Sequence, residues 1–241
     1  MKLFSKMRMG SISGKRFGNY ILYAIGEIVL VVLGILIAVG INNWNEDKKE
    51  ADRLATYLHN YRTDLVTDTT VIGINLRLLE QKKEAFHLVL SDTMTKQQLM
   101  TTPLAFSLIT THRPLQLQNK GYNELKNYAS NDRTMTDSLV STIITTHAAF
   151  DDLIMQAQER INKDIDENLG YFKNNKEWMA DLLSQKLSDD VIAYFLSDDY
   201  RNRASLHYVL VYKNLHTFLS AYNDHAIGLL ERIDERLSKT P

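Results

Sequence analysis

A run of twenty-two residues from Tyr20 to Ile41, YILYAIGEIVLVVLGILIAVGI, contains one charged side chain, Glu27. A helix rises about 1.5 Å per residue, so this run reaches roughly 33 Å and can cross a hydrocarbon core of about 30 Å. The sequence therefore predicts a transmembrane helix over residues 20–41, and each remaining segment has to be assigned to one side of a membrane.

The charges that flank the run predict its orientation. Residues 1–19 hold five basic side chains and no acidic one, whereas basic and acidic residues are mixed directly after Ile41. Cytoplasmic flanks carry the excess of Lys and Arg. We therefore expect residues 1–19 to form a short basic cytoplasmic tail and residues 42–241 to form an extracytoplasmic domain.

Aromatic residues bracket the run, as expected for side chains that anchor a span in the headgroup layers. Tyr20 and Tyr23 lie near its cytoplasmic end, and Trp44 follows its other end. The alternative is a cleaved signal peptide, for which Ala38-Val39-Gly40 offers small residues. Secretory apolar cores are usually only about 7–15 residues long, so a signal anchor fits better.

Composition excludes several classes of protein. The chain has no cysteine, which rules out disulfides, thiolate metal sites and cysteine nucleophiles. Its net charge of −1 provides no basic field for nucleic acid. A domain of 200 residues can still bury a sufficient apolar core without disulfides.

Residues 42–241 contain only four glycines and three prolines, too few for the turns of a β-rich chain. We predict an all-α fold in which the membrane helix, possibly continuous with a first long helix, precedes an antiparallel helical bundle. The first long helix would bury one face at a three-four spacing that Asp68 and Thr69 interrupt. That face comprises Leu54, Leu58, Tyr61, Leu65, Ile72, Leu76, Leu79, Phe86 and Leu90.

Further helices follow an irregular region that contains Pro103, Pro114 and Gly121. We predict a short helix over residues 121–129 and a long one that begins near Asp132 and ends or bends at Gly170 or within residues 173–176. The repeated LSDD sequence predicts helix starts after Ser188 and Ser197, because a Ser or Asp oxygen caps free amides. The last helix would bury Leu206, Val209, Leu210, Leu215, Phe218, Leu219, Tyr222, Leu229, Leu230 and Ile233.

Glu27 is the strongest candidate for a site residue. An ionised side chain at the centre of a bilayer costs about 2.5–3.5 kcal/mol on insertion scales for Asp, Lys or Arg. At 100° per residue, Glu27, Gly34, Ala38 and Asn45 fall within about 20° of one line on the helix surface. Small residues let helices approach closely. This stripe predicts docking to another membrane helix, and the alternatives are a lipid-facing glutamate and a proton or ion relay.

The other motifs favour structural roles. Residues 164–168 start like a calcium loop, but Leu169 replaces the glycine that the loop requires. The seven histidines never stand at i, i+4, and no catalytic or nucleotide-binding signature occurs. Tyr194, Phe195, Tyr200, Tyr208 and Tyr212 suit core packing better than a pocket. We expect no metal, no cofactor and no enzymatic activity.

The segment YILYAIGEIVLVVLGILIAVGINNWNE, residues 20–46, resembles the N-terminal signature of a family of uncharacterised single-pass proteins of Bacteroidota. KGYNELKNYAS, residues 120–130, is similar to a short helix of that family. The resemblance implies a protein of the bacterial inner membrane with a helical periplasmic domain and no assigned activity.

These features together predict a non-enzymatic, membrane-anchored helical scaffold or interaction protein. It would form a homo-oligomer or dock to a larger membrane protein. Two alternatives stay open: an ion-motive-force-coupled, stator-like subunit that uses Glu27, and an accessory ligand-sensing module that signals through a partner.

Overall fold

A computed structural model describes residues 14–131 and 137–239, with side chains from Leu22 onward except that of Asn131. The described residues contain helices and no strand, which confirms the all-α prediction. The chain divides into two compact units, residues 1–53 and residues 54–241. Helix α1, Gly14–Leu90, runs without a break through both of them.

The first unit contains the apolar part of α1, which is long and apolar enough to cross a membrane by length and composition. In the most apolar eighteen-residue stretch of this helix, no residue is buried against other parts of the protein. The helix continues through residues 42–53, which the sequence pattern indicates as a possibility, because no glycine or proline interrupts it there.

The second unit comprises the rest of α1 and the elements that follow it. They are α2 (Lys96–Met100), η1 (Pro103–Phe106), α3 (Lys120–Asn131), α4 (Ser138–Asn175), α5 (Met179–Leu183), α6 (Asp189–Phe195), α7 (Asp198–Tyr208), the π-helix η3 (Val209–Leu215) and α8 (His216–Ser238). Residues 111–119 have no regular secondary structure.

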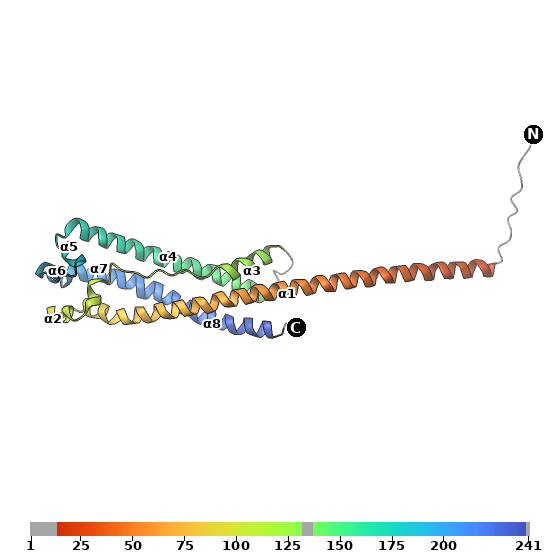
Figure 1. Cartoon of the computed structure of the whole chain (residues 1–241), viewed down its shortest axis with the longest axis horizontal. Helices are drawn as coiled ribbons and strands as arrows, with labels where there is room; N and C mark the ends of the chain where they lie inside the picture. The colour runs from red at the N-terminus through yellow and green to blue at the C-terminus, as the bar shows by residue number, and fades with distance from the viewer. Residues whose placement is uncertain (1–13, 132–136, 240–241) are drawn as a thin grey trace, which may run out of the picture. The chain divides into compact units, whose positions relative to one another are not determined.

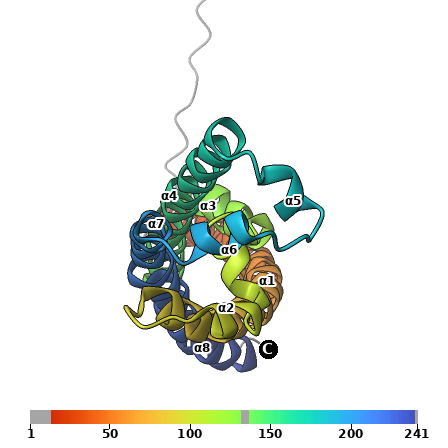
Figure 2. The ribbon, with the colours of Figure 1, turned by 90° about the vertical axis from the view of Figure 1, so that its left-hand side faces the viewer.

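Within this unit the described segments run back and forth along the bundle (Figure 1). The extended residues 111–119 and α3 return antiparallel to α1, so that α4 then runs parallel to α1. The α7–η3–α8 rod runs antiparallel to both long helices. Seen along the bundle, α2, α5 and α6 lie together at the end opposite to the C-terminus of α8 (Figure 2).

Local capping decides where the later helices start. The Asp137 carboxylate accepts hydrogen bonds from the amides of Leu139 and Val140, so α4 begins at Ser138. The predicted start near Asp132 is therefore wrong, and residues 132–136 lie outside the described part. The predicted starts after Ser188 and Ser197 are confirmed, and the Ser197 hydroxyl accepts from the Tyr200 amide.

The π-helix accounts for two errors in the predicted core. Leu206 is 55% exposed and Val209 is 47% exposed, although a 3.6-residue period places both on the buried face. A π turn inserts an extra residue and rotates the positions around it. The buried positions are instead Tyr200, Ala204 and His207 before the insertion, and Val211, Tyr212 and Leu215 within it.

Gly121 marks the closest approach of two helices in the second unit. A β-carbon at this position would lie 2.3 Å from the Tyr61 backbone nitrogen and 2.4 Å from its α-carbon. Because the contacted atoms belong to the backbone of α1, they cannot move aside as a flexible side chain would. The first turn of α3 therefore packs directly on α1 only when residue 121 is glycine.

We predict that Gly121→Ala lowers the free energy of unfolding by about 1–3 kcal/mol or more, because the added methyl group forces α3 away from α1. Denaturant unfolding of the full chain in mild detergent, followed by circular dichroism, measures this change. Gly170→Ala is the matched control, since nothing lies within 4 Å of its β-carbon position in α4. The control should be neutral or stabilising by about 0.5–1 kcal/mol, and equal losses in both variants would refute the close-approach argument.

Candidate functional site

Buried acidic side chains of α1 hold the extended segment and the start of α3. Backbone groups outside helices need hydrogen-bond partners when they are buried. The Asp64 carboxylate accepts from the Gly121 amide at 2.6 Å, and the Asp68 carboxylate accepts from the Gln118 amide at 2.9 Å. Asp68 is the residue that interrupts the apolar spacing of α1, and the interruption is an attachment point for the returning chain.

Side chains of α4 hold the same segment from the other side. The Gln158 amide group both accepts from the Leu115 amide at 2.8 Å and donates to the Leu115 carbonyl at 2.9 Å. Asn168 donates to the Ile109 carbonyl at 3.3 Å. The extended segment is thus fixed between α1 and α4 by side-chain hydrogen bonds that replace a regular ladder.

His147 of α4 completes this polar cluster. Its Nε2 lies 2.8 Å from the Asn119 side-chain oxygen, its Nδ1 lies 3.3 Å from the Tyr61 hydroxyl, and its ring stacks on Tyr122 at 4.4 Å. Burial lowers the pKa of His147 to about 4, so the fold holds a neutral imidazole.

Asp68 also bonds to the last helix, because the Tyr222 hydroxyl donates to its second oxygen at 2.8 Å. Burial raises the pKa of Asp68 to about 6, against the opposing effect of the bonds from Gln118 and Tyr222. One carboxylate therefore connects α1, the extended segment and α8.

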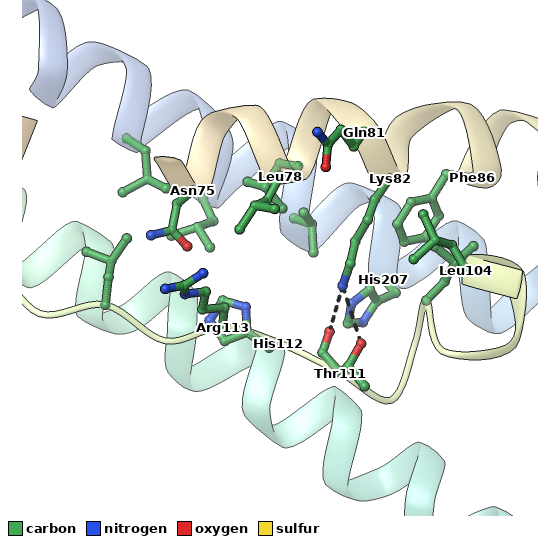
Figure 3. A pocket seen from close by; sticks show the side chains of 16 residues that line it. Asn75, Leu78, Gln81, Lys82, Phe86, Leu104, Thr111, His112, Arg113 and His207 are labelled. Carbon is green, nitrogen blue, oxygen red and sulfur yellow. Dashed lines mark hydrogen bonds between the residues drawn. The ribbon is translucent and has the colours of Figure 1, made fainter. Parts of the chain in front are cut away.

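Beside this framework lies a pocket of about 300 Å³ (Figure 3). It is bounded by α1, by residues 104–115 and by the α7–η3–α8 rod. Its walls are formed by Asn75, Leu78, Leu79, Gln81, Lys82, Phe86, Leu104, Leu108, Thr111, His112, Arg113, Leu115, His207, Val211, Leu215 and Leu219.

Lys82 extends from α1 across this pocket toward Thr111 (Figure 3). Its ammonium group donates to the Thr111 hydroxyl at 3.3 Å and to the Thr111 carbonyl at 3.5 Å. Both acceptors are neutral, and the Thr111 hydroxyl itself donates to the Ser107 carbonyl at 2.8 Å. Burial lowers the pKa of Lys82.

His207 contributes a fixed imidazole to the wall next to Lys82 (Figure 3). Its Nδ1 lies 2.6 Å from the Asp164 carboxylate, which also accepts from Asn168 at 3.1 Å. Arg203 donates to the Asn168 side-chain oxygen at 3.1 Å. A carboxylate at Nδ1 orients the ring and places the Nδ1 proton between the two groups.

Two further basic side chains come from the extended segment, His112 and the exposed Arg113 (Figure 3). The His112 Nε2 is buried without a hydrogen-bond partner among the described residues. Burial lowers the pKa of His112, and the nearby His207 and Lys82 act in the same direction. No Asp or Glu lines the pocket, so its charged lining is entirely basic.

The pocket therefore combines an apolar wall with basic donors, an arrangement typical of ligand binding. Its rod wall contains a π-helix, and such segments are frequent at functional sites. A second hollow of about 570 Å³, beside η1, α4 and α5, has no charged lining residue. No cluster of three metal-ligating side chains occurs in the part of the chain that the structure describes.

The residues predicted from the span are exposed on α1. Glu27, Gly34, Ala38 and Asn45 lie on the exposed surface, and nothing lies within 4 Å of the β-carbon position of Gly34. Tyr23 and Trp44 are 75% and 67% exposed, and the Tyr20 side chain lies outside the described residues. Their roles in docking and membrane anchoring stay predictions.

The sequence motifs do not predict the pocket. Asp164 belongs to the segment that starts like a calcium loop, and the spacing of His207 from the other histidines predicts no site. One usable signal existed: Asp164 and Asn168 stand one turn apart on the face of α4 that also buries Ile161 and Ile165. Polar residues on a core face indicate buried partners. Tyr194, Phe195, Tyr200 and Tyr212 are buried in the core, as expected for packing residues.

Comparison with known proteins gives one match. Residues 27–102 match the model of a family of unknown function, DUF6090. The match supports an uncharacterised domain family and covers less than half of the chain. It begins at Glu27 and includes Lys82, whereas residues 103–241 lie outside it. No curated protein and no solved structure matches this chain.

The pKa of His147 predicts a pH dependence of stability. Its value of about 4 in the folded chain lies below the ordinary 6.5, so protonation favours the unfolded chain. The stability contributed by neutral His147 is present above pH 6.5 and is lost as the pH falls toward 4, by roughly 3 kcal/mol at most. His147→Gln, which does not titrate, should flatten this loss.

Denaturant unfolding of the full chain between pH 4 and pH 7 measures the effect. His59→Gln, at an exposed position on α1, is the matched control and should follow the unmodified protein. Protonation of Asp68, whose pKa is raised to about 6, stabilises the folded chain in the same pH range. This effect is the same in all three proteins, so it does not alter the difference in stability between them. Parallel curves for His147→Gln and the control would contradict the assignment.

Proposed function

We propose that this chain is a non-enzymatic scaffold or interaction protein of the bacterial inner membrane. Its N-terminus would lie in the cytoplasm and its helical domain in the periplasm. It would act by self-association or by docking to a larger membrane protein. The single observation that carries the proposal is the unbroken helix α1, which bears both an exposed apolar span and a face buried in the bundle.

The composition of the span supports a protein contact in addition to a lipid contact. Glu27, Gly34, Ala38 and Asn45 share one line on α1, and all four are exposed. A carboxyl group within hydrocarbon favours a hydrogen-bonding partner, and glycine and alanine allow a second helix to approach. A span that served only as an anchor would need neither feature.

Attachment of the bundle to α1 supports a structural role. Asp64 and Asp68, on the same helix as the span, bind the returning chain directly. A partner held by the stripe would thus be joined to the periplasmic domain through one continuous helix. The pocket specifically favours the ligand-sensing module as a second candidate, which would act through the same partner.

Substitutions on the stripe test the proposal. Glu27→Ala and Gly34→Leu should convert a complex, isolated in mild detergent, into the monomer, because the first removes the polar contact and the second blocks close approach. Chemical cross-linking in native membranes and mass measurement of the extracted particle give the assembly state. Leu36→Ala is the control, since Leu36 lies half a turn from Glu27 on α1.

The expected pattern is loss of assembly in both stripe variants and retention in the control. A particle that is monomeric before any substitution, and that carries no other protein, would refute the proposal. An equal loss of assembly in Leu36→Ala would show that the stripe is not the contact surface.

A further inference from the structure

The pocket of about 300 Å³ has two chemically different parts. Most of its wall consists of Leu, Val and Phe side chains from α1, residues 104–115 and the α7–η3–α8 rod. Its charged side chains are Lys82 and Arg113, and His112 and His207 add two imidazoles. An occupant that matches this lining has an apolar body and an anionic head.

Lys82 identifies where the anionic head would lie. Its ammonium group is half-buried and contacts two neutral oxygens of Thr111, at 3.3 and 3.5 Å. No carboxylate forms an ion pair with Lys82 within residues 22–130 and 137–239. A half-buried cation without a counter-ion is unfavourable, so an anion that reaches this point gains a strong charge-assisted bond.

The surrounding groups favour an anion over a cation. Asp164, which bonds to the lining residue His207, also accepts from Asn168 and does not itself line the pocket. Arg113 adds positive charge on the exposed side of the same wall. The charge of the site is therefore complementary to an anion.

The volume limits the size of the occupant. At roughly 30 Å³ for each water-sized group, 300 Å³ accommodates about ten non-hydrogen atoms. Octanoate has that size, with eight carbons and two oxygens. Butyrate would leave much of the apolar wall uncovered, and a sixteen-carbon acid would extend out of the pocket.

We propose that this pocket binds a medium-chain monocarboxylate, with its carboxylate on Lys82 and its alkyl chain against Leu79, Leu215 and Leu219. The ligand would contact α1, the extended segment and the rod together. This inference goes beyond the proposed scaffold role and does not depend on it, because all lining residues belong to residues 54–241.

Binding of carboxyl-labelled octanoate to the full chain in lipid nanodiscs tests the proposal, with empty nanodiscs as the baseline for lipid partition. We expect a saturable bound signal in carbon NMR and an upward shift of the unfolding temperature. Lys82→Met should weaken binding at least tenfold. Lys83→Met is the matched control, because Lys83 pairs with Glu80 at 3.2 Å and does not line the pocket; it should bind as the unmodified chain does.

A second variant tests the apolar part without changing charge. Leu104→Trp, at a residue that is 42% exposed, should narrow the pocket and abolish octanoate binding while the ligand-free unfolding temperature stays unchanged. Octanol and butyrate should each bind at least tenfold more weakly than octanoate. Signal no greater than that of empty nanodiscs, equal binding to Lys82→Met, or equal binding of octanol and octanoate would overturn the proposal.

Discussion

Two buried carboxylates on one helix determine how this bundle is assembled. Asp64 and Asp68 stand one turn apart on α1 and accept the backbone amides of Gly121 and Gln118. A buried amide without a partner would cost about 1–3 kcal/mol. These bonds therefore make a non-helical, partly buried segment compatible with a helical core, and they fix the position of α3 on α1.

The pocket follows from this arrangement. Gln158 of α4 and Asp68 of α1 hold the extended segment, while Asn168 and Asp64 hold the residues on either side of it, so it lies between the long helices without itself being helical. A fourth helix in that place would pack its side chains densely against α1. The thinner segment brings Thr111, His112 and Arg113 to the wall opposite Lys82 and leaves space beside the π-helix.

Sequence patterns were sufficient to predict the helical class, the apolar span and the starts of α3, α6 and α7, because these depend on local capping and periodicity. Spacing predicts the buried face of α1 in part: six of its nine residues are buried, and Leu76, Leu79 and Leu90 are partly buried against the core. Long-range contacts were not predictable in this way, because Asp164 and His207 are forty-three positions apart in the sequence. The π-helix also shifts which residues face the core, whereas a prediction from a 3.6-residue period assumes a regular helix. Spacing marks Asp68 only as an interruption of the apolar face, because its partners are the distant residues Gln118 and Tyr222.

Hydrogen exchange at the backbone amides of Gln118 and Gly121 tests the central role of Asp64 and Asp68 most directly. Both amides bond to a carboxylate of α1, so in the full chain they should exchange as slowly as amides in the middle of α4. Exchange at the rate of an unstructured peptide at either position would contradict the account, because it would mean that the returning chain is not held on α1 by these carboxylates.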